Sequence, residues 1–237
     1  MAGDSGFKIV DPDQAMLDQL KAKRVDTTTA LPVGIRLNFD PHVARQAAAD
    51  LILAGYPSVR LEMESTPAVI VTMHMVITRD SLSSLRGRLT RFADARGAEV
   101  VGIQVGGGIP PEKSQWKKDS SGNASTDQAD QMVLDGMFAW DVDLRQVMTF
   151  SGGLGFRSEQ AAREAGAALI AEGYPEVSVV QAEFGPVAEA VMYMTPKLKA
   201  IRTLRLELTK FAESRGGTWL GFHVAARLPR TGEPTAS

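Results

Sequence analysis

The chain contains two nearly identical stretches, and this internal repeat constrains its fold more than any other feature. Residues 89–97 read Leu-Thr-Arg-Phe-Ala-Asp-Ala-Arg-Gly, and residues 208–216 read Leu-Thr-Lys-Phe-Ala-Glu-Ser-Arg-Gly. A Gly-Tyr-Pro triplet lies upstream of each, at 55–57 and at 173–175. Both pairs are about 118 residues apart, which is the length of a small domain and not of a solenoid repeat. The repeat predicts one domain present twice, as half 1 (residues 11–106) and half 2 (residues 127–228).

The segment between the halves has a different composition. Residues 107–126 are rich in Gly, Pro, Lys, Ser and Asn, and Ile109 and Trp116 are their only large apolar residues. Such a composition is typical of a flexible linker.

Within each half, apolar periodicity predicts a leading helix followed by strand, helix, strand, strand, helix and strand. In half 1, Asp11-Pro12 and Asp40-Pro41 are predicted helix starts, and Gly55 and Gly97 are predicted helix ends. In half 2, Thr195-Pro196 is predicted to cap the last long helix. This order is that of the ferredoxin-like fold. The predicted class is α+β, with two tandem ferredoxin-like βαββαβ domains, each a four-stranded antiparallel sheet with two helices on one face.

Composition excludes several classes of protein. Lys plus Arg number 26 against 28 Asp plus Glu, and neither half has a basic excess, so we expect no direct nucleic-acid binding. The chain has no cysteine, which excludes disulfides, thiolate metal sites and thiol nucleophiles. No stretch is long and apolar enough for a signal peptide or a membrane span, so we expect a cytoplasmic protein that binds no membrane.

Three features are candidates for chemistry, and each has a simpler explanation. Gly152-Gly153-Leu154-Gly155 sits where a phosphate-binding loop could lie, but it lacks a full nucleotide fingerprint, and a bulged strand is the favoured interpretation. The three histidines, His42, His74 and His223, have no partners at metal-ligand spacing, and Asp141 with Asp143 would need further oxygen ligands. Because no Gly-x-Ser-x-Gly motif occurs either, we predict no catalytic residue, no metal site and no cofactor.

The sheet faces opposite the helices are predicted to differ between the halves. Alternation assigns a polar face to half 1 and a more apolar face to half 2, and exposed Trp and Tyr often anchor contacts. The predicted partner surface comprises Val180, Val191, Tyr193, Trp219, His223, Arg36, Arg60 and His74. The alternative is that this face of half 2 packs on half 1 or on a second copy, which leaves a homodimer open.

Several of these features together resemble the type B regulators of ribonuclease E activity, a bacterial family of ribonuclease E inhibitors. They are the leading helix, the helix ending in Gly-Tyr, the hairpin, the helix ending in Arg-Gly and a last strand with a central Gly. The family's closing motif, Gly-x-Tyr-Asp-Gly-Trp, corresponds here to residues 98–103 and 217–222, which keep the Gly but replace the Asp with Val101 or Leu220 and the Trp with Ile103 or Phe222. The resemblance implies a ferredoxin-like fold and a non-catalytic role in which the protein binds an endoribonuclease and lowers RNA turnover.

Three functions follow as hypotheses. The first is a non-enzymatic regulator that acts by protein–protein binding, with an endoribonuclease as candidate partner. The second is a small-molecule sensor of the amino-acid-binding type, motivated by Gly152–Gly155. The third is a cofactor-free enzyme with His74 or His223 as its base.

Overall fold

The computed structural model describes residues 11–63, 66–106, 127–139 and 142–226, which contain six helices and eight strands. The helices are α1 (Pro12–Ala22), α2 (Pro41–Leu53), α3 (Arg79–Asp94), α4 (Asp127–Ala139), α5 (Glu159–Glu172) and α6 (Leu198–Ser214). The strands are β1 (Ala30–Asn38), β2 (Ser58–Glu62), β3 (Ala68–Val76), β4 (Glu99–Val105), β5 (Met148–Gly155), β6 (Glu176–Ala182), β7 (Gly185–Met194) and β8 (Thr218–Ala226). The α+β class is therefore confirmed, whereas the assignment of two duplicated ferredoxin-like domains stays a prediction. The predicted linker lies outside the described residues.

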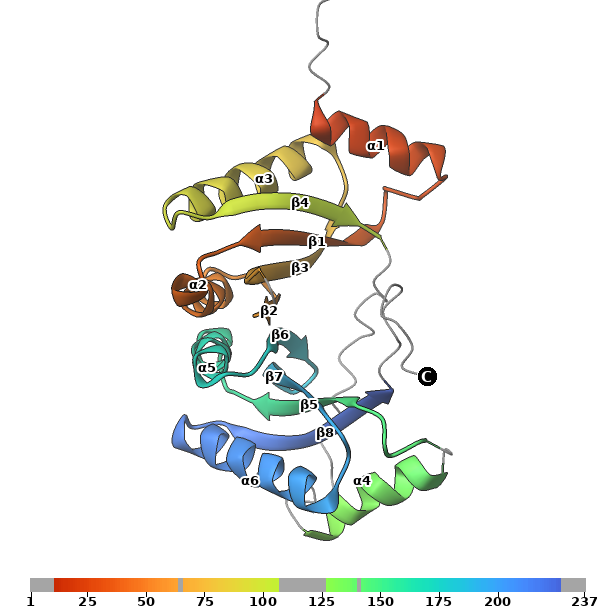
Figure 1. Ribbon diagram of the computed structural model, residues 1–237, viewed down its shortest axis with the longest axis vertical. Coiled ribbons are helices and arrows are strands. Elements are labelled where there is room, and N and C mark those ends of the chain that lie inside the picture. The colour runs from red at the N-terminus through yellow and green to blue at the C-terminus, as the bar shows by residue number, and fades with distance from the viewer. Residues whose placement is uncertain (1–10, 64–65, 107–126, 140–141, 227–237) are drawn as a thin grey trace, which may run out of the picture.

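All eight strands belong to one antiparallel sheet, in the order β4-β1-β3-β2-β6-β7-β5-β8 (Figure 1). The prediction of two separate four-stranded sheets was wrong. Residues 58–60 of β2 pair with residues 176–178 of β6, so the edge strand of half 1 continues directly into the edge strand of half 2. An unpaired edge presents free N–H and C=O groups to any neighbouring strand, and here the two edges satisfy each other.

The four helices α2, α3, α5 and α6 all cover one face of this sheet (Figure 1). Beneath them, alternate residues of most strands are buried, such as Val33, Ile35 and Leu37 of β1, none of which is exposed. Met73, Met75, Met192 and Met194 pack against this core. One hydrophobic core thus runs under the helices of both halves.

Local signals account for most helix ends. Asp11 accepts hydrogen bonds from the backbone N–H groups of Asp13 and Gln14, and Asp40 accepts one from His42, as expected of residues that precede a Pro at the first helical position. Gly173 ends α5 in the left-handed region, at φ 109°. The predicted cap of α6 was wrong, because this helix begins after Lys197, which makes no side-chain capping bond.

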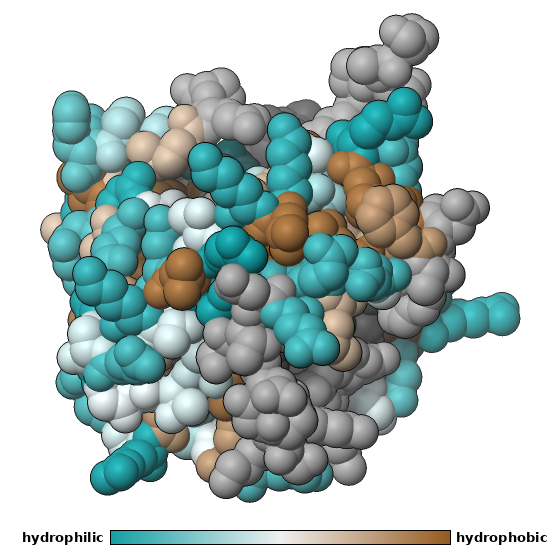
Figure 2. Space-filling view, turned by 90° about the horizontal axis from the view of Figure 1, so that it is seen from below, coloured by the Kyte–Doolittle hydropathy of each residue, from teal (hydrophilic) through white to brown (hydrophobic). Residues whose placement is uncertain are grey.

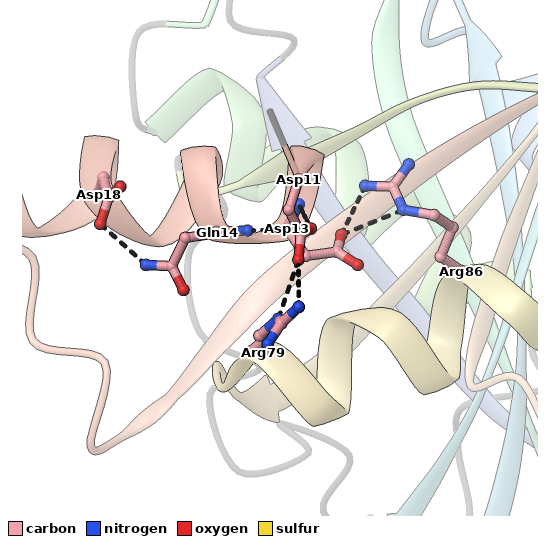
Figure 3. Close-up of polar contacts among 6 residues, drawn as sticks. All are labelled: Asp11, Asp13, Gln14, Asp18, Arg79 and Arg86. Atoms are coloured by element: carbon pink, nitrogen blue, oxygen red, sulfur yellow. Dashed lines mark hydrogen bonds and ion pairs between the residues drawn. The ribbon is translucent and has the colours of Figure 1, made fainter. Parts of the chain in front are cut away.

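Helices α1 and α4 pack against α3 and α6, at opposite ends of the molecule (Figure 1). Arg86 of α3 donates to Asp13 of α1 at 2.7 Å, and Arg79 reaches Asp11 at the same distance (Figure 3). In half 2, Arg205 of α6 donates hydrogen bonds to both carboxylate oxygens of Asp130 on α4, at 2.8 and 2.9 Å. Each leading helix is therefore held by an Asp–Arg pair.

Candidate functional site: the outer face of the sheet

The face of the sheet opposite the four covering helices, here called the outer face, carries most of the predicted partner surface. Since side chains alternate along a strand, the neighbours of the buried core positions point to this side. The outer face includes Arg36, Asn38, Arg60, Glu62, Thr72, His74, Glu176, Ser178, Val180, Glu189, Val191, Tyr193 and His223.

Four of the predicted residues lie in one row that crosses the whole sheet. Arg36 and Arg60 both lie opposite Ile70 of β3, one on each side of it. Val191 and His223 likewise both lie opposite Ser151 of β5. The two parts of the row meet at β2 and β6, where Arg60 lies opposite Glu176, which in turn lies opposite Val191. With strands about 4.8 Å apart, Arg36 and His223 are roughly 29 Å from each other. The row is thus an extended surface and not a single compact constellation.

The charges of this surface are largely compensated within it. Glu62 accepts from Arg36 at 2.6 Å and lies 3.1 Å from Arg60. Across the junction, Glu176 accepts from the Tyr193 hydroxyl at 2.8 Å, and Glu189 accepts from Ser178 at 2.7 Å. The side chains of Arg36 and Arg60 are 38% and 32% exposed, so they are held in position yet still reach solvent.

Three buried polar atoms on the half 1 part of the outer face have no hydrogen-bond partner among the described residues. They are Oδ1 of Asn38, Nε of Arg60 and Nε2 of His74. Buried polar atoms in native proteins are nearly always paired, so these three would each gain a bond from a ligand, water or partner group. Burial also lowers the pKa of His74, which favours its neutral form at neutral pH.

Trp219 does not belong to the outer face, so its predicted place in the partner surface was wrong. It is 7% exposed and packs in the main core, with its ring 4.8 Å from that of Phe222. The reason is a register shift in the pairing of β5 with β8, between Gly153 and Leu154, which turns Trp219 to the helix side. Gly221, at φ 130°, was the sequence signal for this irregularity.

Two of the three glycines of β5, Gly152 and Gly155, are explained by packing. A Cβ on Gly152 would overlap the Leu208 side chain and lie 3.1 Å from the Trp219 ring, so the absent side chain leaves room for the indole. Gly155 has Leu220 of β8 in the same close relation, at 3.3 Å. The favoured interpretation of residues 152–155 as an irregular strand is therefore confirmed, because all four lie in β5 and the register shifts there.

The predicted residues of half 2 differ in their burial. Val180 and Tyr193 are half-buried, Val191 is buried, and His223 is exposed. Val180 joins Ala182, Val187 and Leu220 in a small apolar cluster separate from the main core. His42 is exposed at the start of α2, on the opposite side from His74 and His223, so the structure does not bring the three histidines together.

Neither a metal-binding cluster nor a membrane-spanning helix occurs among the described residues. No three His, Asp or Glu side chains in these ranges gather as ligands. Asp143 accepts instead from the backbone N–H and the guanidinium of Arg145, and these bonds lower the pKa of its carboxyl. Asp141 lies outside the described residues. Within the same ranges, every helix falls short of the length and apolarity needed to cross a bilayer.

A second surface of half 2 is apolar. Figure 2 shows brown, apolar side chains at the end of the molecule that carries α4 and α6. Met132 and Phe138 of α4 are 66% and 65% exposed, and Leu206 of α6 is 52% exposed. None of the three was predicted as a surface residue, although an amphipathic helix with Met and Phe on its polar side is a readable signal.

Comparison with protein-family models finds no match, and comparisons with curated proteins and with solved structures find none either. The resemblance to regulators of ribonuclease E activity therefore stays a prediction. What the protein does has to be argued from the outer face.

Proposed function

We propose that this chain is a non-enzymatic regulatory protein, built from two ferredoxin-like domains, that binds a protein partner through the outer face of its sheet. The partner that the sequence resemblance suggests is an endoribonuclease, whose activity the protein would lower. A cytoplasmic location belongs to the same proposal.

The observation that carries this proposal is the row across the sheet. Its residues are spread over roughly 29 Å, which suits the footprint of a protein better than that of a small molecule. The outer face is charged in half 1, at Arg36 and Arg60, and in half 2 it adds the half-buried side chains of Val180 and Tyr193. A surface with ordered charges at one end and apolar groups with a Tyr at the other resembles the mixed composition of protein–protein interfaces.

The unpartnered polar atoms on the half 1 part of the face give independent support. A partner that places donors or acceptors near Asn38, Arg60 and His74 would satisfy atoms that otherwise lack a bond. Desolvated, preorganised groups of this kind contribute to specificity, because a wrong partner leaves them unsatisfied.

The proposal is tested by measuring binding of the purified protein to purified bacterial ribonuclease E, together with RNA decay in the same mixture. We expect a complex, and decay slowed in proportion to its formation. The double variant Arg36→Ala/His223→Ala should weaken binding by about tenfold or more, as expected when both ends of an interface are truncated.

A matched control is the double variant Arg91→Ala/His42→Ala, which removes the same two types of side chain from exposed positions on α3 and α2. We expect its affinity to stay within about twofold of the unchanged protein. Equal weakening by both double variants would exclude the outer face as the binding surface. The variant Phe138→Ser then tests the apolar end of half 2 as the alternative surface.

The nuclease assignment and the surface assignment fail in different ways. Unchanged decay and no complex would remove ribonuclease E as partner. A small-molecule sensor stays the alternative hypothesis, but close packing against Trp219 and Leu220 gives Gly152 and Gly155 a structural role that needs no ligand.

A further inference from the structure

The junction between the two halves is made of contacts that occur in reciprocal pairs. Val59 of β2 lies directly opposite Val177 of β6, and neither is exposed. These two valines are themselves 118 positions apart, so each is the repeat equivalent of the other. A two-fold rotation that exchanges the halves would pass through this pair.

Backbone hydrogen bonds on both sides of the valine pair obey the same symmetry. The N–H of Leu61 donates to the carbonyl of Pro175 at 2.7 Å. The N–H of Val179 donates to the carbonyl of Pro57, also at 2.7 Å. Donors and acceptors are again 118 positions apart, so one bond is the symmetry mate of the other.

Two arginines make the equivalent reciprocal contact between the helices. Nη1 of Arg45 on α2 donates to the carbonyl of Ile170 in the last turn of α5, at 3.2 Å. Nη1 of Arg163 on α5 donates to the carbonyl of Ile52 in the last turn of α2, at 3.1 Å. Each cation thus sits at the C-terminus of the other helix, where free carbonyls and the helix dipole favour positive charge.

The packing of α2 on α5 follows the same rule. Both helices bury the same six positions, mostly with small side chains, so that each can lie on the sheet and against its mate at once. In α2 these are Ala44, Ala47, Ala48, Ala49, Leu51 and Ile52, and in α5 they are Ala162, Ala165, Gly166, Ala167, Leu169 and Ile170.

Contacts in which residue i meets j and j meets i are the mark of an isologous, two-fold interface between identical subunits. We infer that the junction is a homodimer-type interface retained inside one chain, and that each half carries a complete binding surface for the other half. The halves therefore stay paired without a covalent connection. This pairing does not depend on the partner proposed above.

One cross-strand pair departs from the symmetry and sets a preference for unlike halves. Arg60 lies opposite Glu176, and Ser58 lies opposite Ser178. In a pair of two half 1 units, the same register would place Arg60 opposite Ser58 of the other copy, so Arg60 would keep its contact with Glu62 but lose the carboxylate across the junction. Opposite charges directly across two strands are favourable, so the half 1–half 2 pair is preferred over like pairs.

The first test cuts the full-length protein after a protease site is inserted within residues 107–126. We expect the two fragments to co-elute and to appear as one complex in native mass spectrometry. The double variant Arg45→Ala/Arg163→Ala should raise the dissociation constant of the cut protein by about tenfold or more, because it removes two charge-assisted hydrogen bonds.

The control is Arg91→Ala/Lys210→Ala, which removes one exposed cation from α3 and one from α6, at repeat-equivalent positions away from the junction. It should leave the dissociation constant unchanged. Each uncut double variant is checked for its circular dichroism, since the intact chain keeps the halves at high local concentration. Fragments of the cut protein that separate or aggregate would overturn the inference, as would equal effects of the two double variants.

The second test unfolds and refolds the cut protein and counts the three kinds of pair by native mass spectrometry. Unlike pairs should exceed the half expected from random pairing. Arg60→Glu, which would face Glu176, should reduce their share, whereas Arg91→Glu should not. A random distribution that ignores Arg60→Glu would refute the preference for unlike halves.

Discussion

The two halves differ in the sizes of the core side chains that lie at corresponding positions beneath their helices. In half 1, Ile35 of β1 and Val100 of β4 are diagonal neighbours on the helix side, since Ile35 lies opposite Ile103 and Val100 lies opposite Leu37. At the corresponding positions in half 2, strand pairing places Gly152 and Trp219. One half divides the volume between two aliphatic residues, and the other gives nearly all of it to one indole. Core packing depends on the summed volume and shape of neighbours, so a repeat can keep its backbone while individual residues change size.

The Asp–Arg pairs that hold the leading helices also differ between the halves. The side chains of Arg205 and Asp130 are 4% and 1% exposed, whereas those of Arg86 and Asp13 are 30% and 7% exposed. The half 1 pair is therefore partly open to water, through Arg86, whereas the half 2 pair is fully buried. Removal of one partner should reveal the difference.

The largest expected effect is that of Asp130→Ala. It removes the carboxylate that accepts two bonds from the buried Arg205 guanidinium, at 2.8 and 2.9 Å, which should lower the free energy of unfolding by about 3–5 kcal/mol. Asp13→Ala should cost only about 1 kcal/mol, because water can reach Arg86. Urea unfolding followed by circular dichroism gives both values. Asp135→Ala, an exposed carboxylate on the same helix as Asp130, serves as control and should cost less than about 0.5 kcal/mol. Equal losses at Asp130 and Asp13 would show that burial does not distinguish the two pairs.

The next largest losses of unfolding free energy are expected from substitutions at Gly152 and Trp219, two positions that share one volume in the core. Trp219→Val leaves a cavity beside Gly152 and should cost about 3 kcal/mol. Gly152→Ile alone should cost about as much, because its side chain would overlap Leu208 and the indole. The double variant restores the pair of aliphatic residues found in half 1.

A double-mutant cycle measures whether the two positions share one volume. We expect a favourable coupling of about 1–3 kcal/mol in the unfolding free energy, so that the double variant loses clearly less stability than the sum of the two single losses. The cycle Ile35→Gly with Val100→Trp is the mirror experiment in half 1. Additive losses in both cycles would disprove the shared volume.

Sequence patterns predicted the elements of this fold well and their assembly less well. Helix starts at Asp11 and Asp40 and the C-cap at Gly173 depend on neighbours within four residues, which the sequence displays directly. The pairing of β2 with β6 depends on backbone groups that every residue carries, so the side chains gave little sign that two edges would join. The small buried residues of α2 and α5 were the available hint, since such helices are buried on more than one side.

The outer face shows the same division. Alternation placed Arg36, Arg60, His74, Val191 and Tyr193 correctly, because period-two patterns survive in regular strands. It failed at Trp219, since one bulge reverses the direction of every residue beyond it. It also gave no weight to Glu176, whose importance comes from lying opposite Arg60 across the junction. The aromatic character predicted for the half 2 face therefore reduces to Tyr193.

A smaller effect concerns the start of the last helix in each half. Thr78 caps α3 by accepting from the N–H of Ser81, whose hydroxyl accepts in return from the N–H of Thr78. The equivalent positions before α6 are Lys197 and Ala200, and Lys197 makes no capping bond although its backbone is extended. Thr78→Ala should cost about 1 kcal/mol, and Lys197→Thr/Ala200→Ser should stabilise by up to about 1 kcal/mol.

Thermal unfolding of the two variants, with Lys210→Thr as a control for loss of an exposed lysine on α6, checks this prediction. The result for Lys197→Thr/Ala200→Ser matters most, because it shows whether the capping residues of α3 stabilise α6 when they are introduced there. A neutral Lys197→Thr/Ala200→Ser variant would mean that the start of α6 is already satisfied by other means.

The smallest effect at neutral pH, and one that emerges only in alkali, concerns the two tyrosines of the Gly-Tyr-Pro triplets. Burial raises the pKa of Tyr174 to about 12, and the carboxylates of Glu207 and Glu172 act in the same direction. Burial also raises the pKa of Tyr56, but there the guanidinium of Arg88, 5.9 Å from the ring centre, opposes it. Arg88 and Glu207 hold equivalent positions, so opposite charges face the same tyrosine in the two halves.

Because the folded pKa of Tyr174 exceeds the value near 10 of an unfolded tyrosine, its contribution to stability is complete below pH 10 and is lost as pH rises from about 10 to 12. Tyr174→Phe should flatten the decline of stability over this window more than Tyr56→Phe does. Because the chain has three tyrosines, the tyrosinate absorbance of each group is obtained as the difference between the alkaline titrations of the unchanged protein and of its Tyr→Phe variant. Glu207→Arg should lower the pKa of Tyr174 and Arg88→Glu should raise that of Tyr56, which would make each half titrate more like the other. If both exchanges leave the titrations unchanged, burial alone sets the two pKa values, and the opposite charges at this position serve neither tyrosine.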